Sequence, residues 1–110
     1  MTSCTIYSQD LENETYQEFF DNKNPKYEIS YLNGKKNGIE KFWYESGQLK
    51  MQSEFKNGKE HGLWQQWYEN GQQKSQSEWI SGEKIGLEWT WDRDGNLLSK
   101  DHYQNGKIVQ

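Results

Sequence analysis

The side chains in this sequence best suited to catalysis or metal binding are two histidines and one cysteine. His61 and His102 stand 41 positions apart in polar segments, and nothing in the pattern supplies either with the further ligands of a zinc site. Cys4 lies near a terminus, whereas a nucleophilic thiol needs a base fixed beside it. Glu45 and Glu69 are repeat-equivalent turn residues that we expect to be solvated. The sequence therefore predicts no catalytic site, no metal and no cofactor, and we do not expect an enzyme.

Aromatic residues are the second group that could form a site, and they make up 15% of the chain. If the surrounding segments are strands, Phe42, Tyr44, Trp64 and Tyr68 project from one face of two neighbouring units. Exposed rings mark protein interfaces, because they bury a large area at a small entropic cost. These four residues are predicted to bind a partner. The alternative is that the N-terminal segment folds over them.

Charge is distributed unevenly along the chain, whose formal net charge is −4. Five of the 17 acidic residues but one of the 13 basic residues lie in residues 1–25, so the rest is neutral overall. This predicts an acidic N-terminal arm over residues 1–14 that steers the chain toward a basic partner, or else a solvated acidic surface. The acidic residues predicted to contact the partner are Asp10, Glu12, Glu14 and Glu18.

Two classes of anionic partner are disfavoured by the same distribution of charge. No basic stripe that would bind nucleic acid is visible in the sequence, and an anionic membrane would recruit lysine and arginine clusters. The segments GKKNG, GKEHG and GEKIG lack the apolar strand and the helix that flank a phosphate-binding loop. We therefore expect neither nucleic acid nor a membrane as the partner.

The elements that position these residues follow a repeat of 24 residues, which is typical of repeat proteins. All ten glycines fall into three series with this spacing, namely Gly34, Gly58, Gly82 and Gly106; Gly38, Gly62 and Gly86; and Gly47, Gly71 and Gly95. Trp43, Trp67 and Trp91 keep the same period. The repeat domain, residues 15–110, divides into a degenerate unit 15–37 and the units 38–61, 62–85 and 86–110.

Each unit is predicted to be a pair of β-strands. Two Gly-containing turn dipeptides occur in every regular unit, and the short segments between them suit strands better than helices. A three-residue loop with its glycine in the left-handed region is expected at Ser46-Gly47. The predicted fold class is all-β: an antiparallel meander of repeated β-hairpins in a single curled sheet, with six regular strands after two irregular ones. A short helix over residues 9–20 is the alternative near the N-terminus.

Alternation of apolar and polar residues in residues 48–56 predicts which side chains share a face. Leu49, Met51, Ser53 and Phe55 point one way. The same parity places a larger set on that face, namely Ile39, Trp43, Leu63, Trp67, Trp79, Leu87, Trp89, Trp91, Leu97 and Tyr103. The rings on this face are expected to be covered by curling of the sheet.

The repeat resembles the MORN repeat, and more closely its bacterial variant. The matching residues are Gly38, Trp43, Tyr44, Gly47, Gln48, Phe55, Asn57, Gly58 and Lys59, and in the next unit Gly62, Trp67, Tyr68, Glu69, Asn70, Gly71, Gln72, Trp79 and Gly82. The third unit departs, because Asp92 replaces the tyrosine and Asn96 replaces the glutamine. The resemblance covers residues 15–110 and implies a β-hairpin array.

The resemblance also implies a binding function. Proteins with the bacterial variant are labelled as antitoxin or immunity components, so the resemblance implies that the chain neutralises a cognate protein toxin. A basic nuclease is the kind of toxin that would suit the acidic arm. Other MORN proteins are membrane-associated or act as scaffolds, which is the alternative. The open end of an array permits a homodimer, and an edge strand over residues 97–104 could pair with a partner strand.

The compartment is indicated by the single cysteine and by the N-terminal residues. Cys4 cannot form an internal disulfide, which fits a reducing environment. No apolar run reaches transmembrane length, and the first ten residues lack the basic and apolar regions of a signal peptide. The cytoplasm is the expected location, provided that no leader has been removed.

Overall fold

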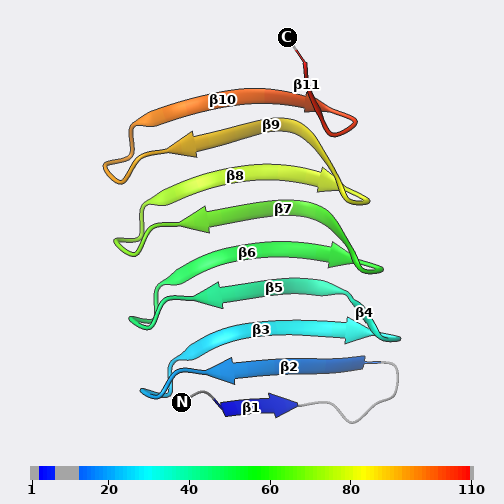
Figure 1. Cartoon of the computed structure of the whole chain (residues 1–110), viewed down its shortest axis with the longest axis vertical. Coiled ribbons are helices and arrows are strands. Elements are labelled where there is room, and N and C mark those ends of the chain that lie inside the picture. Colours follow the sequence, from blue (N-terminus) through cyan, green and yellow to red (C-terminus); the bar gives the residue numbers. More distant parts are fainter. Residues whose placement is uncertain (1–2, 7–12, 110) are drawn as a thin grey trace.

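The structure, a computed structural model, describes residues 3–6 and 13–109 and consists of one antiparallel β-sheet. Its strands follow one another in chain order, except that β4 is a short segment beside β3 (Figure 1). The elements are β1 (Ser3–Ile6), β2 (Asn13–Phe19), β3 (Pro25–Leu32), β4 (Lys35–Lys36), β5 (Gly38–Trp43), β6 (Leu49–Lys56), β7 (Lys59–Trp67), β8 (Gln73–Ile80), β9 (Glu83–Trp91), β10 (Leu97–Gln104) and β11 (Lys107–Val109). The predicted all-β meander of hairpins in a single sheet is confirmed.

The N-terminal region extends this sheet instead of forming a helix. Residues 13–19 are strand β2, which pairs with β1 on one side and with β3 on the other. The helix considered for residues 9–20 is therefore wrong for residues 13–19, while residues 9–12 lie outside the described part. Strands β1 and β2 lie beside the array, so the described N-terminal residues do not fold over the rings of later units.

Two kinds of turn, each repeated along the array, connect the strands. Asn57 and Gly58 have φ values of 52° and 83°, as a turn with two left-handed residues requires, and the turns at Asn33-Gly34, Ser81-Gly82 and Asn105-Gly106 are alike. At the opposite edge, the Tyr44 N–H donates to the Gln48 carbonyl at 2.9 Å and encloses a three-residue loop. Gly47 has a φ of 100° in this loop, so the predicted loop is confirmed.

A β-bulge follows each three-residue loop and overturns the predicted faces. Trp43 pairs with Leu49, but Phe42 pairs with Met51, so Lys50 is an extra residue in its strand. The equivalent register shifts leave Lys26, Lys74 and Leu98 without a direct partner. An extra residue inverts the alternation of side chains beyond it. Leu49 and Met51 therefore do not share a face, contrary to the prediction from residues 48–56.

The sheet consequently carries aromatic residues on both faces. What we call the leucine face keeps most of the predicted set, namely Ile39, Trp43, Leu49, Leu63, Trp67, Leu87, Trp89, Trp91 and Leu97. What we call the serine face carries Phe42, Met51, Ser53, Phe55, Trp64, Ser77, Trp79 and Tyr103. The placement of Trp79, Tyr103, Met51, Ser53 and Phe55 beside the Trp43 series was wrong, because the bulges separate the two groups.

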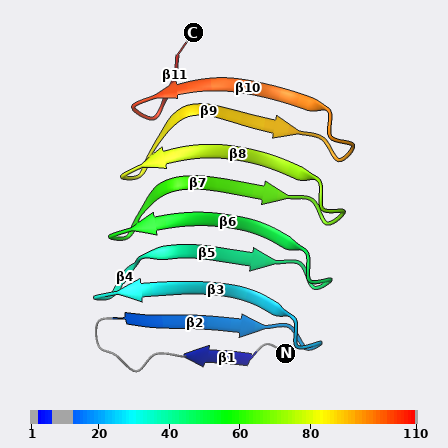
Figure 2. The same ribbon diagram turned by 180° about the vertical axis from the view of Figure 1, so that it is seen from behind.

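The array is a single layer without a second sheet or helix against it. It measures 47 × 32 × 14 Å, and Figures 1 and 2 show bowed strands with no other described element in front of or behind them. Ile29 is the one buried apolar residue in the described part of the chain. Ile39, Leu63 and Leu87 on the leucine face are 40–44% exposed. Stability must therefore depend largely on cross-strand contacts and on bonds between units.

Hydrogen bonds from equivalent positions join the three regular units, 38–61, 62–85 and 86–110, to one another. The Tyr44 hydroxyl donates to the Trp67 carbonyl at 2.8 Å, and the Tyr68 hydroxyl donates to the Trp91 carbonyl at 2.8 Å. In the last unit Asp92 takes this position, and its carboxylate accepts hydrogen bonds from the Asp94 and Asn96 N–H groups of its own loop. These bonds lower the pKa of Asp92, the backbone bond from Asn96 being the largest cause.

Candidate functional site

The structure separates the four rings that the sequence predicted as one partner-binding cluster. Phe42 and Trp64 lie on the serine face. Tyr44 and Tyr68 lie at the loop edge, where their hydroxyls join units, and burial is the largest cause of the raised pKa of Tyr44. The bulge lysines stand over both tyrosine rings, with the Lys50 ammonium 5.5 Å from the Tyr44 ring centre. The two tyrosines therefore have structural contacts that sequence reasoning missed.

The acidic residues predicted to contact a partner are placed only in part. Asp10 and Glu12 lie outside the described residues. Glu14 is exposed at the start of β2 and pairs with Tyr31. Glu18, on the serine face, accepts a hydrogen bond from the Tyr16 hydroxyl at 3.0 Å. Of this group, Glu18 is the one that the structure brings near Phe42, as a neighbour in the same cavity.

A cavity of about 380 Å³ crosses strands β2 to β6 on the serine face. Its apolar part is formed by Phe42, Met51 and Tyr27, whose ring centre is 4.6 Å from that of Phe42. The register explains this grouping, because Phe42 pairs with Tyr27 on one side and with Met51 on the other. The cavity is lined by Glu18, Lys26, Tyr27, Lys36, Glu40, Phe42 and Met51.

Glu40 is the most enclosed charged group of this cavity, with 6% of its surface exposed. Its carboxylate accepts hydrogen bonds from the Tyr27 hydroxyl at 2.5 Å and from the Lys36 ammonium at 2.7 Å. Burial, followed by this hydrogen bond to Glu40, raises the pKa of Tyr27 far above its usual range. Lys36 also lies 5.0 Å above the Phe55 ring centre. These contacts hold the polar wall of the cavity in one arrangement.

Trp64 occupies the position equivalent to Glu40 in the next unit. It pairs with Ser53 and Ser77, which are both buried, and its ring centre is 5.3 Å from that of Trp79. The Trp64 indole N–H is buried and has no acceptor among the described residues. A buried donor without an acceptor is costly and uncommon in native structures. The serine face therefore carries a feature that packing alone does not explain.

A smaller cavity of about 140 Å³ adjoins Trp64. Its other lining residues are Gln66, Ser75, Ser77, Lys84 and Glu88. Lys84 and Glu88 form an ion pair of 2.8 Å that repeats the Lys36–Glu40 pair two units later. The serine face thus combines rings, fixed ion pairs and small hollows along the array.

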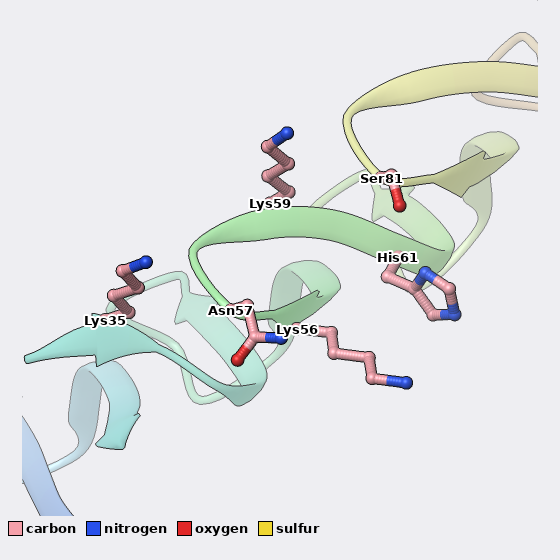
Figure 3. Close-up of a pocket in the computed structure, with 6 residues that line it drawn as sticks. All are labelled: Lys35, Lys56, Asn57, Lys59, His61 and Ser81. Atoms are coloured by element: carbon pink, nitrogen blue, oxygen red, sulfur yellow. The ribbon is translucent and has the colours of Figure 1, made fainter. Parts of the chain in front are cut away.

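A third hollow, of about 370 Å³, lies at the edge formed by the Asn-Gly turns (Figure 3). We call it the basic edge, and it is lined by Lys35, Lys56, Asn57, Lys59, His61 and Ser81. Sequence reasoning treated the GKKNG and GKEHG segments separately and so missed the hollow. The sequence signal for it was that Lys56 and Lys59 flank the Asn57-Gly58 turn and are therefore partners across the hairpin.

The predicted absence of a metal centre and of catalysis concerned Cys4, His61, His102, Glu45 and Glu69. Cys4 is opposite Glu18 in the β1–β2 pair, and His102, on β10, pairs with Leu87 on the leucine face, three strands along the sheet from His61 on β7. Over residues 3–6 and 13–109 no three histidine, cysteine or acidic side chains are grouped to hold a metal. Within the same residues no helix could cross a membrane.

Comparison with known proteins gives one family. The family model described as "MORN repeat variant" matches residues 15–33, 36–57, 60–80 and 85–110, which is most of the chain. No curated protein sequence matches the chain significantly.

Proposed function

Because the chain belongs to the MORN repeat variant family, whose repeats here build a thin β-array, we propose that it is a non-catalytic binding protein. The proposal places a protein partner on the serine face. It is supported chiefly by the 380 Å³ cavity, in which the Tyr27 and Phe42 rings lie beside fixed carboxylate and ammonium groups. Aromatic residues surrounded by polar contacts are typical of hot spots, the few residues that dominate the binding energy of a protein–protein interface.

The lining of the cavity suits a partner side chain that is apolar along its length and cationic at its end. Phe42 and Met51 offer apolar surface, and Glu18 has no ion pair among the described residues. Lysine and arginine bury their methylene groups while their charged ends stay near a carboxylate or water. A basic partner would also be attracted by the excess of acidic residues in residues 1–25.

The more specific form of the proposal is that this partner is a toxin and that the chain is its antitoxin or immunity protein. The resemblance to the bacterial variant supports this, together with the net charge of −4. A basic nuclease is the toxin class that the charge fits best. Charge complementarity would speed association, and the buried rings would hold the complex.

The experiment uses the product of the gene adjacent to the one for this chain, titrated into the full-length chain by calorimetry. Phe42→Ala and Trp64→Ala are expected to weaken the complex about tenfold or more, which is about 1.4 kcal/mol. Glu18→Lys is expected to slow association. Leu63→Ala on the leucine face is the matched control, and circular dichroism checks the fold of each variant.

Two results would contradict the proposal in separable ways. If Leu63→Ala weakens the complex and the serine-face variants do not, the partner occupies the leucine face. If the adjacent gene product binds but is harmless to a host cell, or if the chain does not protect that cell, the antitoxin assignment fails while the binding function stands.

A membrane-associated or scaffolding protein is the second candidate. The row of Ile39, Leu63 and Leu87, each 40–44% exposed, and the basic edge are the observations that favour it. Flotation with phosphatidylcholine vesicles in the absence of any protein partner, abolished by Leu63→Glu, would support this candidate over the first.

A homodimer is a related assembly that the sheet permits. Strand β11 pairs with His102–Gln104, and the outer edge of residues 97–101 has no strand partner in the described part of the chain. Leu97 and Leu98 at this edge are 52% and 64% exposed. Light scattering on the wild type and on Leu98→Lys would reveal a dimer that uses this edge.

A further inference from the structure

We propose that the basic edge binds a phosphate-type oxyanion, which is a site separate from the serine face. The ligand is a phosphate monoester or free phosphate, held by ammonium, imidazole, amide and hydroxyl donors. The hollow of about 370 Å³ has room for such a group, and every side chain that lines it can donate a hydrogen bond.

The lysines of the basic edge are not held in ion pairs within the described part of the chain. Lys35, Lys56 and Lys59 form no ion pair among the described residues, in which the recorded pairs involve Lys36 and Lys84. The acidic residues of the adjoining strands, Glu54, Glu60, Glu78 and Glu83, do not line the hollow. Three lysines and a histidine in one hollow produce a local positive potential that an anion lowers.

One pair of lysines occupies directly paired positions in this hairpin. Lys56 and Lys59 are direct cross-strand partners on either side of the Asn57-Gly58 turn. Like charges placed directly opposite each other destabilise a sheet. The equivalent pairs Leu32–Lys35, Ile80–Glu83 and Gln104–Lys107 contain no such repulsion. A lysine pair is thus peculiar to this hairpin, and its repulsion is reduced because the two side chains point to different sides of the turn (Figure 3).

The repeat geometry positions the donors around the hairpin. Figure 3 shows that Lys56 and His61 reach in the same direction, while Lys35 and Lys59 point to the other side; Ser81 lines the same hollow. The Lys35 side chain passes close to Gly58, where a Cβ would lie 3.7 Å from its own Cβ. We therefore assign direct contact with the anion to Lys56, His61 and Ser81, and a supporting electrostatic role to Lys35 and Lys59.

The histidines provide a direct test, since the chain contains only His61 and His102. Inorganic phosphate is titrated into the full chain at constant ionic strength, and the two imidazole signals are followed by NMR, with His102→Gln to assign them. Binding should shift the His61 signal saturably, because the bound anion lies beside the imidazole ring that lines the hollow. His102, which pairs with Leu87 and Val109, is the internal control and should not move.

Two charge variants locate the site. Lys56→Gln should weaken the apparent phosphate affinity roughly threefold to fivefold, the range expected for a partly solvated ion pair. Lys107→Gln, in the equivalent turn of the last unit, should leave it unchanged. Equal shifts of both histidines, a linear response without saturation, or equal effects of the two variants would overturn the proposal.

A second arm distinguishes the sources of the phosphate. Vesicles of phosphatidylcholine with phosphatidic acid present the same monoester on a surface, and vesicles of phosphatidylcholine alone are the control. If the chain sediments with the phosphatidic acid vesicles, and if inorganic phosphate competes with this binding and Lys56→Gln weakens it, the site is assigned to a lipid headgroup. A saturable His61 shift without sedimentation assigns it to a free phosphate compound. Sedimentation that Lys56→Gln does not alter, with no His61 shift, would refute the site.

Discussion

The hydrogen bonds between units permit a quantitative test of how this array is stabilised. Tyr44→Phe removes a hydroxyl that donates to the Trp67 carbonyl at 2.8 Å and leaves the aromatic ring in place. A hydrogen bond of this kind contributes about 0.5–1.5 kcal/mol net, and the half-buried setting of both groups favours the middle of that range. We expect the free energy of unfolding to fall by about 1 kcal/mol, which lowers Tm by roughly 4 °C in a domain of this size.

The second tyrosine of the series extends the test. Tyr68→Phe removes the equivalent bond to the Trp91 carbonyl, also at 2.8 Å. The two bonds join different pairs of units and share no acceptor, so the double variant should lose about 2 kcal/mol. Tyr103→Phe is the control, because no hydrogen bond of its hydroxyl is recorded in the described residues. Its effect should stay within about 0.5 kcal/mol.

The assay is urea unfolding followed by tryptophan fluorescence, with the slope m compared among the variants to confirm that the same surface is exposed. A stability of Tyr44→Phe equal to that of the wild type would refute the role of these bonds. A loss for Tyr103→Phe as large as that for Tyr44→Phe would show that the hydroxyl matters for another reason. In either case the hydrogen bond would not explain why a tyrosine occupies position 44, and its predicted contact with a partner would be the remaining explanation.

Three further predictions concern strain and titration. Gly62→Ala should destabilise the fold by about 1–3 kcal/mol in urea unfolding, because φ is 116° and the added Cβ would lie 2.5 Å from a Glu54 carboxylate oxygen. The double variant Gly62→Ala/Glu54→Ala should recover only part of the lost stability. Full recovery would show that backbone strain contributes nothing. The raised pKa of Tyr27, caused first by burial and then by Glu40, means that its contribution to stability is complete below about pH 10 and is lost as the pH rises above that value. Tyr27→Phe should reduce this alkaline loss and leave the part due to Tyr44, whose pKa is also raised, and an unchanged profile would contradict it. The pKa of Asp92 is lowered by hydrogen bonds from its loop, and a carboxyl NMR titration should place it below the usual value of about 3.9. The contribution of Asp92 to the stability of the fold is therefore present above that value and is lost as the pH falls through the lowered pKa. A titration midpoint at or above the usual value would refute the loop geometry.

Much of the fold follows from local features of the sequence. The glycines at intervals of 24 residues mark positions where the backbone adopts positive φ, and these positions divide the chain into short strands whatever surrounds them. The three-residue loop at Ser46-Gly47 and the turn at Asn57-Gly58 depend on residues adjacent in the chain. Such features can be predicted without tertiary information, and the repeat provides several examples of each.

The candidate site was less predictable, since it depends on which strand positions face each other. Of the predicted ring cluster, Phe42 and Trp64 share the serine face, whereas Tyr44 and Tyr68 join units at the loop edge; that these residues bind a partner stays a prediction. The roles of Glu40 and Tyr27 were missed because they are 13 residues apart and meet only through strand pairing. The basic edge was not predicted for the same reason, because one of its residues, Lys35, comes from the preceding hairpin.

The sequence alone determined the repeat, the turns, the order of the strands and the charge of the N-terminal region. Only the tertiary structure decided which side of the sheet each ring occupies. The physical reason is the bulge at Lys50 and its equivalents, where one extra residue opposite Trp43 inverts the alternation of every side chain beyond it. The residue types next to Lys50 do not predict this bulge. Whether two strands pair with or without an extra residue depends on contacts that both strands make.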